Sequence, residues 1–124
     1  VVFHRVIDGF MAQTGDVQFG KMGEGFDIRR AGMGGSDRED LQAEFSDKSF
    51  ERGVVGMARS QDPNSANSQF FIMFAPAPHL NGGYTIVGEV TEGMDVVDAI
   101  KRGAGRNGAV VGEPDVMTKV EVTE

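Results

Sequence analysis

The fold is decided by the opening of the chain, which reads VVFHRVI (1–7), DG (8–9), FMAQT (10–14) and GD (15–16). The first and third of these pieces are rich in β-branched and aromatic residues, which favour strands. Asp8-Gly9 between them is a turn signal, and Gly15-Asp16 closes the second strand. We therefore predict a β-hairpin with residues 1–7 and 10–14 as its strands.

Alternation along the first strand separates its side chains into two sets. Phe3, Arg5 and Ile7 share one face of a strand, while His4 and Val6 share the other. An arginine among apolar neighbours is either a member of a buried ion pair or part of a functional site, because an uncompensated buried charge is costly. The residues alone leave both roles of Arg5 open.

Further β-rich runs follow at residues 54–58, 69–74 and 84–90, and a loosely alternating run at 116–122 predicts a last strand. The run at 69–74 is nearly all apolar, so we expect it to be buried on both faces. Residues 15–40 hold seven glycines and no sustained periodicity. We predict a long excursion from the sheet there, anchored to the core by Phe45 and Phe50.

One segment has helical periodicity. Met94, Val97 and Ile100 recur at helical spacing, and Gly103 stands where a helix would end. The pattern predicts a single helix over residues 92–102.

Length and composition limit the possible classes. The chain has 124 residues, and we expect residues 1–124 to form one domain. Its net charge of −7 argues against binding nucleic acid through phosphates, and no apolar run approaches the ~20 residues of a membrane span. With no cysteine and two histidines, we expect no metal site and no cofactor. The G-x-G-x-x-G pattern at 103–108 follows the predicted helix, whereas a dinucleotide-binding turn would precede one, so we interpret it as a helix exit.

Four groups of motifs stand out along the chain: residues 3–16, GMAR (56–59) with NSQFFI (67–72), LNG (80–82) with YTIVGEV (84–90), and GMDVV (93–97). Together they resemble the signatures of cyclophilin-type peptidyl-prolyl isomerases. The motifs follow the family's order and spacing over almost the whole chain, and their residues are similar to those of small bacterial members. The resemblance implies a mainly β fold. It implies an antiparallel eight-stranded β-barrel with capping helices, whose first two strands and first helix are expected to precede Val1.

The resemblance also implies roles for individual residues. Arg5 matches the catalytic arginine, and Gln13 matches the glutamine that hydrogen-bonds the substrate backbone. The proline pocket is implied to consist of Phe10, Met11, Phe71 and Leu80. The backbone of Ala58 and Arg59 is implied to pair with the substrate. The same site is implied to be lined by His4, Gln69 and Tyr84. Arg59 stands where the family often has asparagine, and Tyr84 stands where many members have histidine.

The implied activity is cis–trans isomerisation of X-Pro bonds in proline-containing peptides and in unfolded or flexible protein segments. His79 stands where cyclosporin-sensitive members carry tryptophan, so we expect cyclosporin to bind weakly. The bacterial pattern leads us to expect a cytoplasmic protein, although export stays open, and the family resemblance implies a monomer. Charge and apolar-run length lead us to expect no nucleic-acid or membrane partner. Two alternatives also stay open: a proline-peptide binding module without catalysis, and an N-terminally incomplete chain that is inactive alone.

Overall fold

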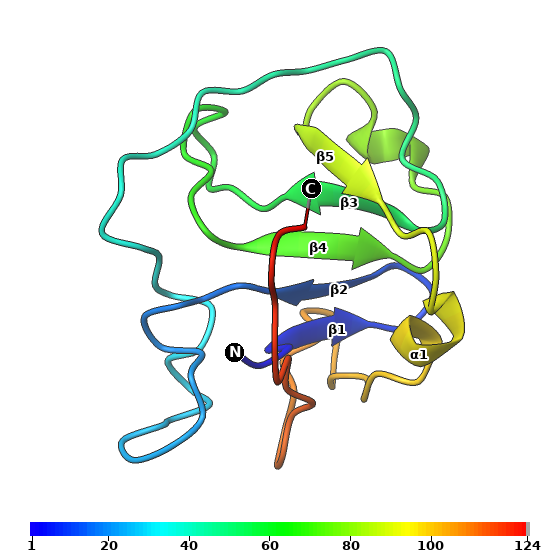
Figure 1. Ribbon diagram of the computed structural model, residues 1–124. Coiled ribbons are helices and arrows are strands. Elements are labelled where there is room, and N and C mark those ends of the chain that lie inside the picture. The colour runs from blue at the N-terminus through cyan, green and yellow to red at the C-terminus, as the bar shows by residue number, and fades with distance from the viewer. Residues whose placement is uncertain (124) are drawn as a thin grey trace.

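The computed structural model describes residues 1–123, and its framework is a five-stranded antiparallel sheet (Figure 1). The strands are β1 (Arg5–Ile7), β2 (Met11–Thr14), β3 (Val54–Met57), β4 (Phe70–Met73) and β5 (Ile86–Glu89). They lie in the order β1-β2-β4-β3-β5. Two short helices accompany the sheet, the 3-10 helix η1 (Pro78–Leu80) and the α-helix α1 (Met94–Asp98). The predicted mainly β class and the opening hairpin are confirmed.

The predicted sixth strand at residues 116–122 is wrong. Only Val116 pairs, through an isolated bridge to Val2. The alternating valines beyond it face outward, with Val120 72% and Val122 94% exposed. Because Met117 alone in this segment packs against the core, no continuous buried side fixes a register, and the alternation does not produce a strand.

The observed helix α1 (Met94–Asp98) is shorter than the helix predicted over residues 92–102. Gly93 precedes α1 with a φ of 83°, a left-handed conformation that keeps residues before it out of the helix. At the other end, the N–H of Lys101 donates to the Asp115 carboxylate (2.7 Å). The Lys101 N–H therefore bonds a side chain instead of continuing the helical hydrogen-bond pattern. Ile100, just before it, packs into the core.

The excursion between β2 and β3 runs around the outside of the sheet (Figure 1). Phe50 anchors it as predicted, since it is 1% exposed and belongs to the core. The expectation for Phe45 is wrong, because this side chain is 46% exposed.

Two rows of paired residues cross the sheet and define its two faces. Arg5, Gln13, Phe71 and Gly56 are paired in succession along one row. Side chains alternate between faces along each strand, so the next row points the other way. That row contains Val6, Ala12, Ile72 and Val55.

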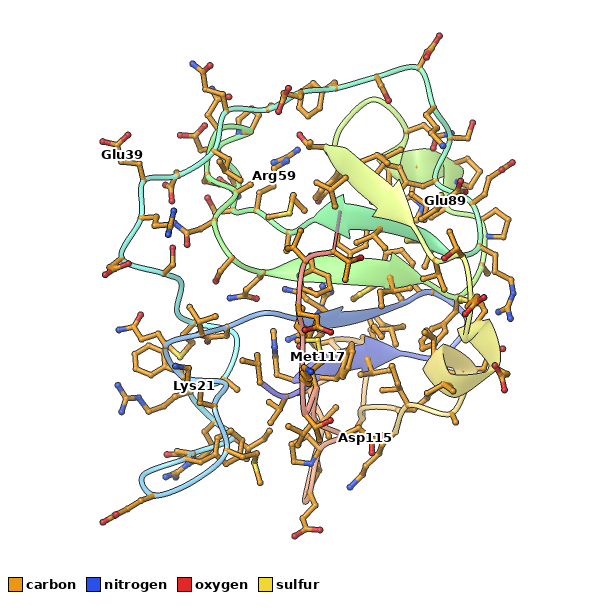
Figure 2. All side chains as sticks on the ribbon, viewed as in Figure 1. Lys21, Glu39, Arg59, Glu89, Asp115 and Met117 are labelled. Carbon is orange, nitrogen blue, oxygen red and sulfur yellow. The ribbon has the colours of Figure 1, made fainter. Side chains whose placement is uncertain are left out.

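Each face carries its own apolar core. The face of Phe71 packs with Phe50, Val54, Met73 and Leu80. The opposite face packs with Phe3, Phe74, Ile100, Val110 and Met117. The C-terminal segment that carries Met117 crosses in front of this second face (Figures 1 and 2).

Strand β4 differs from the expectation of burial on both faces. Phe71 and Met73 are buried, whereas Phe70 and Ile72 are only half-buried. Neither helix in residues 1–123 has the length and apolarity that crossing a membrane would require.

Candidate active site

A small pocket opens beside the row that joins Arg5 to Gly56. Its volume is about 120 Å³, and its walls are formed by Arg5, Phe10, Met11, Gln13, Ala58, Arg59, Phe71, Leu80 and Tyr84. All nine are residues to which the sequence resemblance assigned a role at the site. The pocket is well below the roughly 300–1,000 Å³ of clefts that hold drug-sized ligands, so it suits one small side chain. We call it the proline-sized pocket below.

The apolar wall of this pocket is rigidly packed. Phe71 stacks on Phe50 with ring centroids 5.8 Å apart, and the Tyr84 ring lies nearly perpendicular to Phe71 with centroids 5.9 Å apart. Gly56 makes this stacking possible, because a Cβ there would lie 2.7 Å from both Phe50 and Phe71. Such packing holds side chains in defined positions, so the pocket is already formed in the free chain.

Arg5 enters the rim of the pocket from β1 and is held by two hydrogen bonds. Its Nε–H donates to the carbonyl oxygen of Asn107 (2.8 Å), and its Nη1–H donates to Oε1 of Gln13 (3.1 Å). Arg5 forms no salt bridge within residues 1–123. The guanidinium is therefore a fixed positive charge whose remaining N–H groups can face a bound molecule.

The Asn107 carbonyl that accepts the hydrogen bond from Arg5 lies in the glycine-rich turn 103–108. An isolated bridge joins Ala104 to Ala109 and closes it. Gly108 has a φ of 73°, and a Cβ there would lie 3.0 Å from the carbonyl oxygen of Val6. The glycine pattern thus lets the turn press against β1 and bring the Asn107 carbonyl to Arg5.

Gln13 links the pocket to Gln69, which lies outside it. The Nε2–H of Gln13 donates to Oε1 of Gln69 (2.9 Å). Gln69 lines a second, polar hollow of about 500 Å³ that shares Gln13, Ala58 and Arg59 with the proline-sized pocket. The two hollows therefore form adjoining parts of one groove.

Arg59 follows β3 and Tyr84 precedes β5, and the two side chains together form one wall of the proline-sized pocket. The Arg59 guanidinium carbon lies 4.5 Å from the centre of the Tyr84 ring. Its Nη2–H donates to the carbonyl oxygen of Gly83 (2.8 Å), and its Nε–H donates to the same oxygen (3.1 Å). This cation–π contact and the paired hydrogen bonds keep the arginine flat against the wall.

The structure places His4 apart from the proline-sized pocket. Alternation along the strand turns its side chain away from Arg5, and it is 7% exposed. Its ring packs against Gly32, where a Cβ would lie 2.8 Å from Nε2. Burial first, and the positive charge of Arg5 second, lower the pKa of His4, while Asp16 and Gln69 oppose the shift. His4 is thus a buried neutral side chain behind the site.

Sequence reasoning missed Asp16, Asn67 and Asn107. Asp16 is fully buried and accepts backbone hydrogen bonds, and Asn67 binds Ser36 through its Oδ1 (2.7 Å). Asp and Asn in loops commonly bind nearby backbone N–H groups, so Asp16 directly after a strand was a usable signal. The contact of Asn107 uses its backbone carbonyl, which no residue pattern reveals.

Among residues 1–123, no three His, Cys, Asp or Glu side chains are grouped closely enough to hold a metal ion. What the site offers instead is an apolar pocket with a fixed guanidinium at its rim and amide donors beside it. Such a site can hold a small apolar ring and favour negative charge or a lone pair that develops next to the ring.

Comparison with known proteins gives a consistent result. The sequence profile described as "Cyclophilin type peptidyl-prolyl cis-trans isomerase/CLD" matches residues 1–122. A Brucella abortus protein named "Probable peptidyl-prolyl cis-trans isomerase" is 62% identical over 122 residues, which are 98% of this chain and 62% of that protein. A Gallus gallus protein named "Peptidyl-prolyl cis-trans isomerase-like 3" is 41% identical over 102 residues, 82% of this chain and 58% of that protein.

A solved structure agrees with the fold. The crystal structure of a cyclophilin from Hirschia baltica superposes with a TM-score of 0.64 at 25% identity, over 88% of this chain and 56% of that one. The chain spans 62% of the length of its Brucella relative.

Proposed function

The chain belongs to the cyclophilin-type peptidyl-prolyl cis-trans isomerase family, and from this premise we propose that it accelerates rotation about X-Pro peptide bonds. The observation that carries the proposal is the proline-sized pocket with Arg5 fixed at its rim. Proline-containing peptides and flexible protein segments are its substrates, and protein folding is the process it assists.

The reaction needs a fixed charge rather than a nucleophile. Resonance gives the peptide bond partial double-bond character and a rotation barrier of ~18–20 kcal/mol. When an X-Pro bond twists, the proline nitrogen loses conjugation and gains a lone pair. A guanidinium directed at that nitrogen binds the twisted bond more strongly than the planar one, and this difference accelerates the reaction. We assign this role to Arg5.

The remaining residues hold the substrate while the bond turns. Met11, Phe71 and Leu80 offer an apolar surface for the proline ring, and exclusion of water there strengthens the field of Arg5. Gln13 donates one Nε2–H to Gln69, and its second Nε2–H can donate to a carbonyl of the peptide. The N–H of Arg59 makes no hydrogen bond within residues 1–123, which supports pairing of the Ala58–Arg59 backbone with the substrate.

Three finer features belong to the same proposal. Cyclosporin binds weakly, because His79 is exposed and makes only a tilted ring contact with Phe10 at 5.5 Å. Replacing His79 with tryptophan should therefore tighten cyclosporin binding in a titration. The protein is a monomer, which sedimentation tests, and it resides in the cytoplasm, which fractionation of the source cells tests.

The proposal is tested by measuring exchange between the cis and trans forms of a short Ala-Pro peptide by NMR, with and without the chain. Catalysis predicts faster exchange at protein concentrations far below that of the peptide. Peptide line broadening with unchanged exchange would instead identify a proline-peptide binding module. Thermal unfolding of the same sample controls for folding, since a chain that does not fold alone lacks a cooperative transition.

A further inference from the structure

The hydrogen bonds that orient Arg5 continue beyond the site into the long excursion. Gln13 donates to Gln69, and the Nε2 group of Gln69 donates to the carbonyl oxygens of Gly32 (2.9 Å) and Gly34 (2.8 Å). Three side chains, Arg5, Gln13 and Gln69, thereby connect the rim of the pocket to two peptide groups of the excursion.

A buried carboxylate fixes these same two residues from the other side. Oδ2 of Asp16 accepts the N–H groups of Gly32 (2.8 Å) and Gly34 (2.9 Å). Oδ1 accepts the N–H groups of Gln18 (2.9 Å) and Phe19 (2.8 Å). Burial alone would raise the pKa of Asp16, but the four N–H donors together lower it, so the group stays ionised at neutral pH.

The arrangement leaves no room for adjustment near Asp16. Asp16 is 0% exposed. A Cβ at Gly34 would lie 2.7 Å from Oδ1 of Asp16, so this close approach requires glycine. The carbonyls that meet Gln69 are consequently held in one place by backbone geometry.

The chain of hydrogen bonds has a single direction. The glycine carbonyls can only accept, so Gln69 must turn its Nε2 toward them and its Oε1 toward Gln13. Gln13 must then turn its Nε2 toward Gln69 and its Oε1 toward Arg5. Guanidinium groups can only donate, so Arg5 completes the same order from the other end.

We infer that Asp16 is a positioning residue for the reaction: it fixes the carbonyls of Gly32 and Gly34, which orient Gln69 and, through Gln13, the guanidinium of Arg5. The inference rests on the proposed function for its effect on rate. Its structural part, the orientation of Gln13, does not depend on activity. Asp16 lies outside the proline-sized pocket, so it acts on the substrate only through other residues.

Two substitutions interrupt this chain of hydrogen bonds at different points. In Asp16→Asn, an amide donor replaces an oxygen that faces two backbone N–H groups, which loosens Gly32 and Gly34 or the turn at Gln18. Gln69→Met keeps a similar shape and leaves every bond of Asp16 intact, but it removes the acceptor of Gln13. Asp27→Asn is the matched control, because Asp27 binds backbone and Arg29 in the same excursion without touching Gly32 or Gly34.

We expect Asp16→Asn and Gln69→Met each to slow catalysed exchange of the Ala-Pro peptide by about tenfold, as for one misplaced hydrogen bond at the reacting group. The double variant should be no slower than the slower single variant, because both act through one chain of bonds. Asp27→Asn should remain within about twofold of the parent. The NMR signals of the Gln13 side-chain amide and the Arg5 Nε–H should shift in both variants and stay in place in the control.

Several results would overturn the inference. A folded Asp16→Asn variant with the parent's rate and unchanged Gln13 signals would do so, as would additive losses in the double variant. If Asp16→Asn fails to fold, Gln69→Met decides: unchanged rate and Gln13 signals refute the coupling of the two glutamines to Arg5. If the parent chain itself does not accelerate exchange, the proposed function fails. The Gln13 signals in Asp16→Asn would then still support or refute the orientation.

Discussion

Replacing Arg5 with alanine is predicted to remove most of the isomerisation while the sheet stays folded. The Nε–H of Arg5 donates to Asn107 and its Nη1–H donates to Gln13. Its Nη2 group has no hydrogen-bond partner within residues 1–123. That group is free to meet the proline nitrogen. Hydrogen bonds to charged groups are worth about 1.5–3 kcal/mol. If this energy is expressed only in the twisted state, its loss lowers kcat/KM by about 10- to 150-fold.

The cost to stability is expected to be smaller. Arg5 is half-buried and its partners are neutral acceptors near the surface, so removing it leaves no charge buried without a partner. We expect the free energy of unfolding in urea to fall by about 1 kcal/mol. Arg5→Lys is the matched variant, since it keeps the positive charge but cannot reproduce the planar fork, and its activity should lie between those of the parent and Arg5→Ala.

The assay is NMR exchange of the Ala-Pro peptide, with urea unfolding measured on the same preparations. A folded Arg5→Ala variant that isomerises as fast as the parent would refute the role of the guanidinium. Loss of cooperative unfolding in Arg5→Ala would instead show that Arg5 supports the fold, contrary to the account.

Three further predictions concern the packing around the pocket and its response to pH. Gly56→Ala should lower the free energy of unfolding by about 1–3 kcal/mol and weaken peptide binding, because the new methyl group displaces the Phe71 ring; an unperturbed unfolding curve would contradict this. Arg59→Lys should weaken peptide binding more than it lowers stability, since it loses the paired bonds to Gly83 at an accessible wall, and equal affinity in a titration would count against that role. Because burial lowers the pKa of His4 below its ordinary 6.5, the stability from neutral His4 should be complete above pH 6.5 and decline as pH falls below it. Urea unfolding across this range should show that slope, and His4→Gln should flatten it.

Much of the site could be predicted because short strands carry their side chains in fixed alternation. Once Arg5 and Gln13 lie on a tight hairpin, cross-strand pairing brings them together. The family motif around Phe71 and Gly56 then extends the same row. The roles of all nine pocket residues come from the resemblance to the cyclophilin family, and strand register explains how Arg5, Gln13 and Phe71 come to lie side by side.

The contacts that could not be predicted join segments far apart in the chain through backbone groups. The Asn107 carbonyl that receives Arg5 is one of them, and the Gly32 and Gly34 carbonyls that receive Gln69 are others. A backbone carbonyl has the same chemistry in every residue, so no sequence pattern reveals which one will be used.

Alternation failed as a guide where no partner strand fixes it. The valines of 116–122 repeat like a strand, yet they mostly face outward. Period-two patterning predicts a strand only when one side of the segment is buried against the sheet.

The most direct test of the account combines two NMR measurements on one sample of the chain with an Ala-Pro peptide. One measures cis–trans exchange, and the other measures nuclear Overhauser effects between the proline ring and protein side chains. The account predicts accelerated exchange together with contacts from the ring to Met11, Phe71 and Leu80. Accelerated exchange with contacts elsewhere, or contacts in this pocket without acceleration, would contradict it.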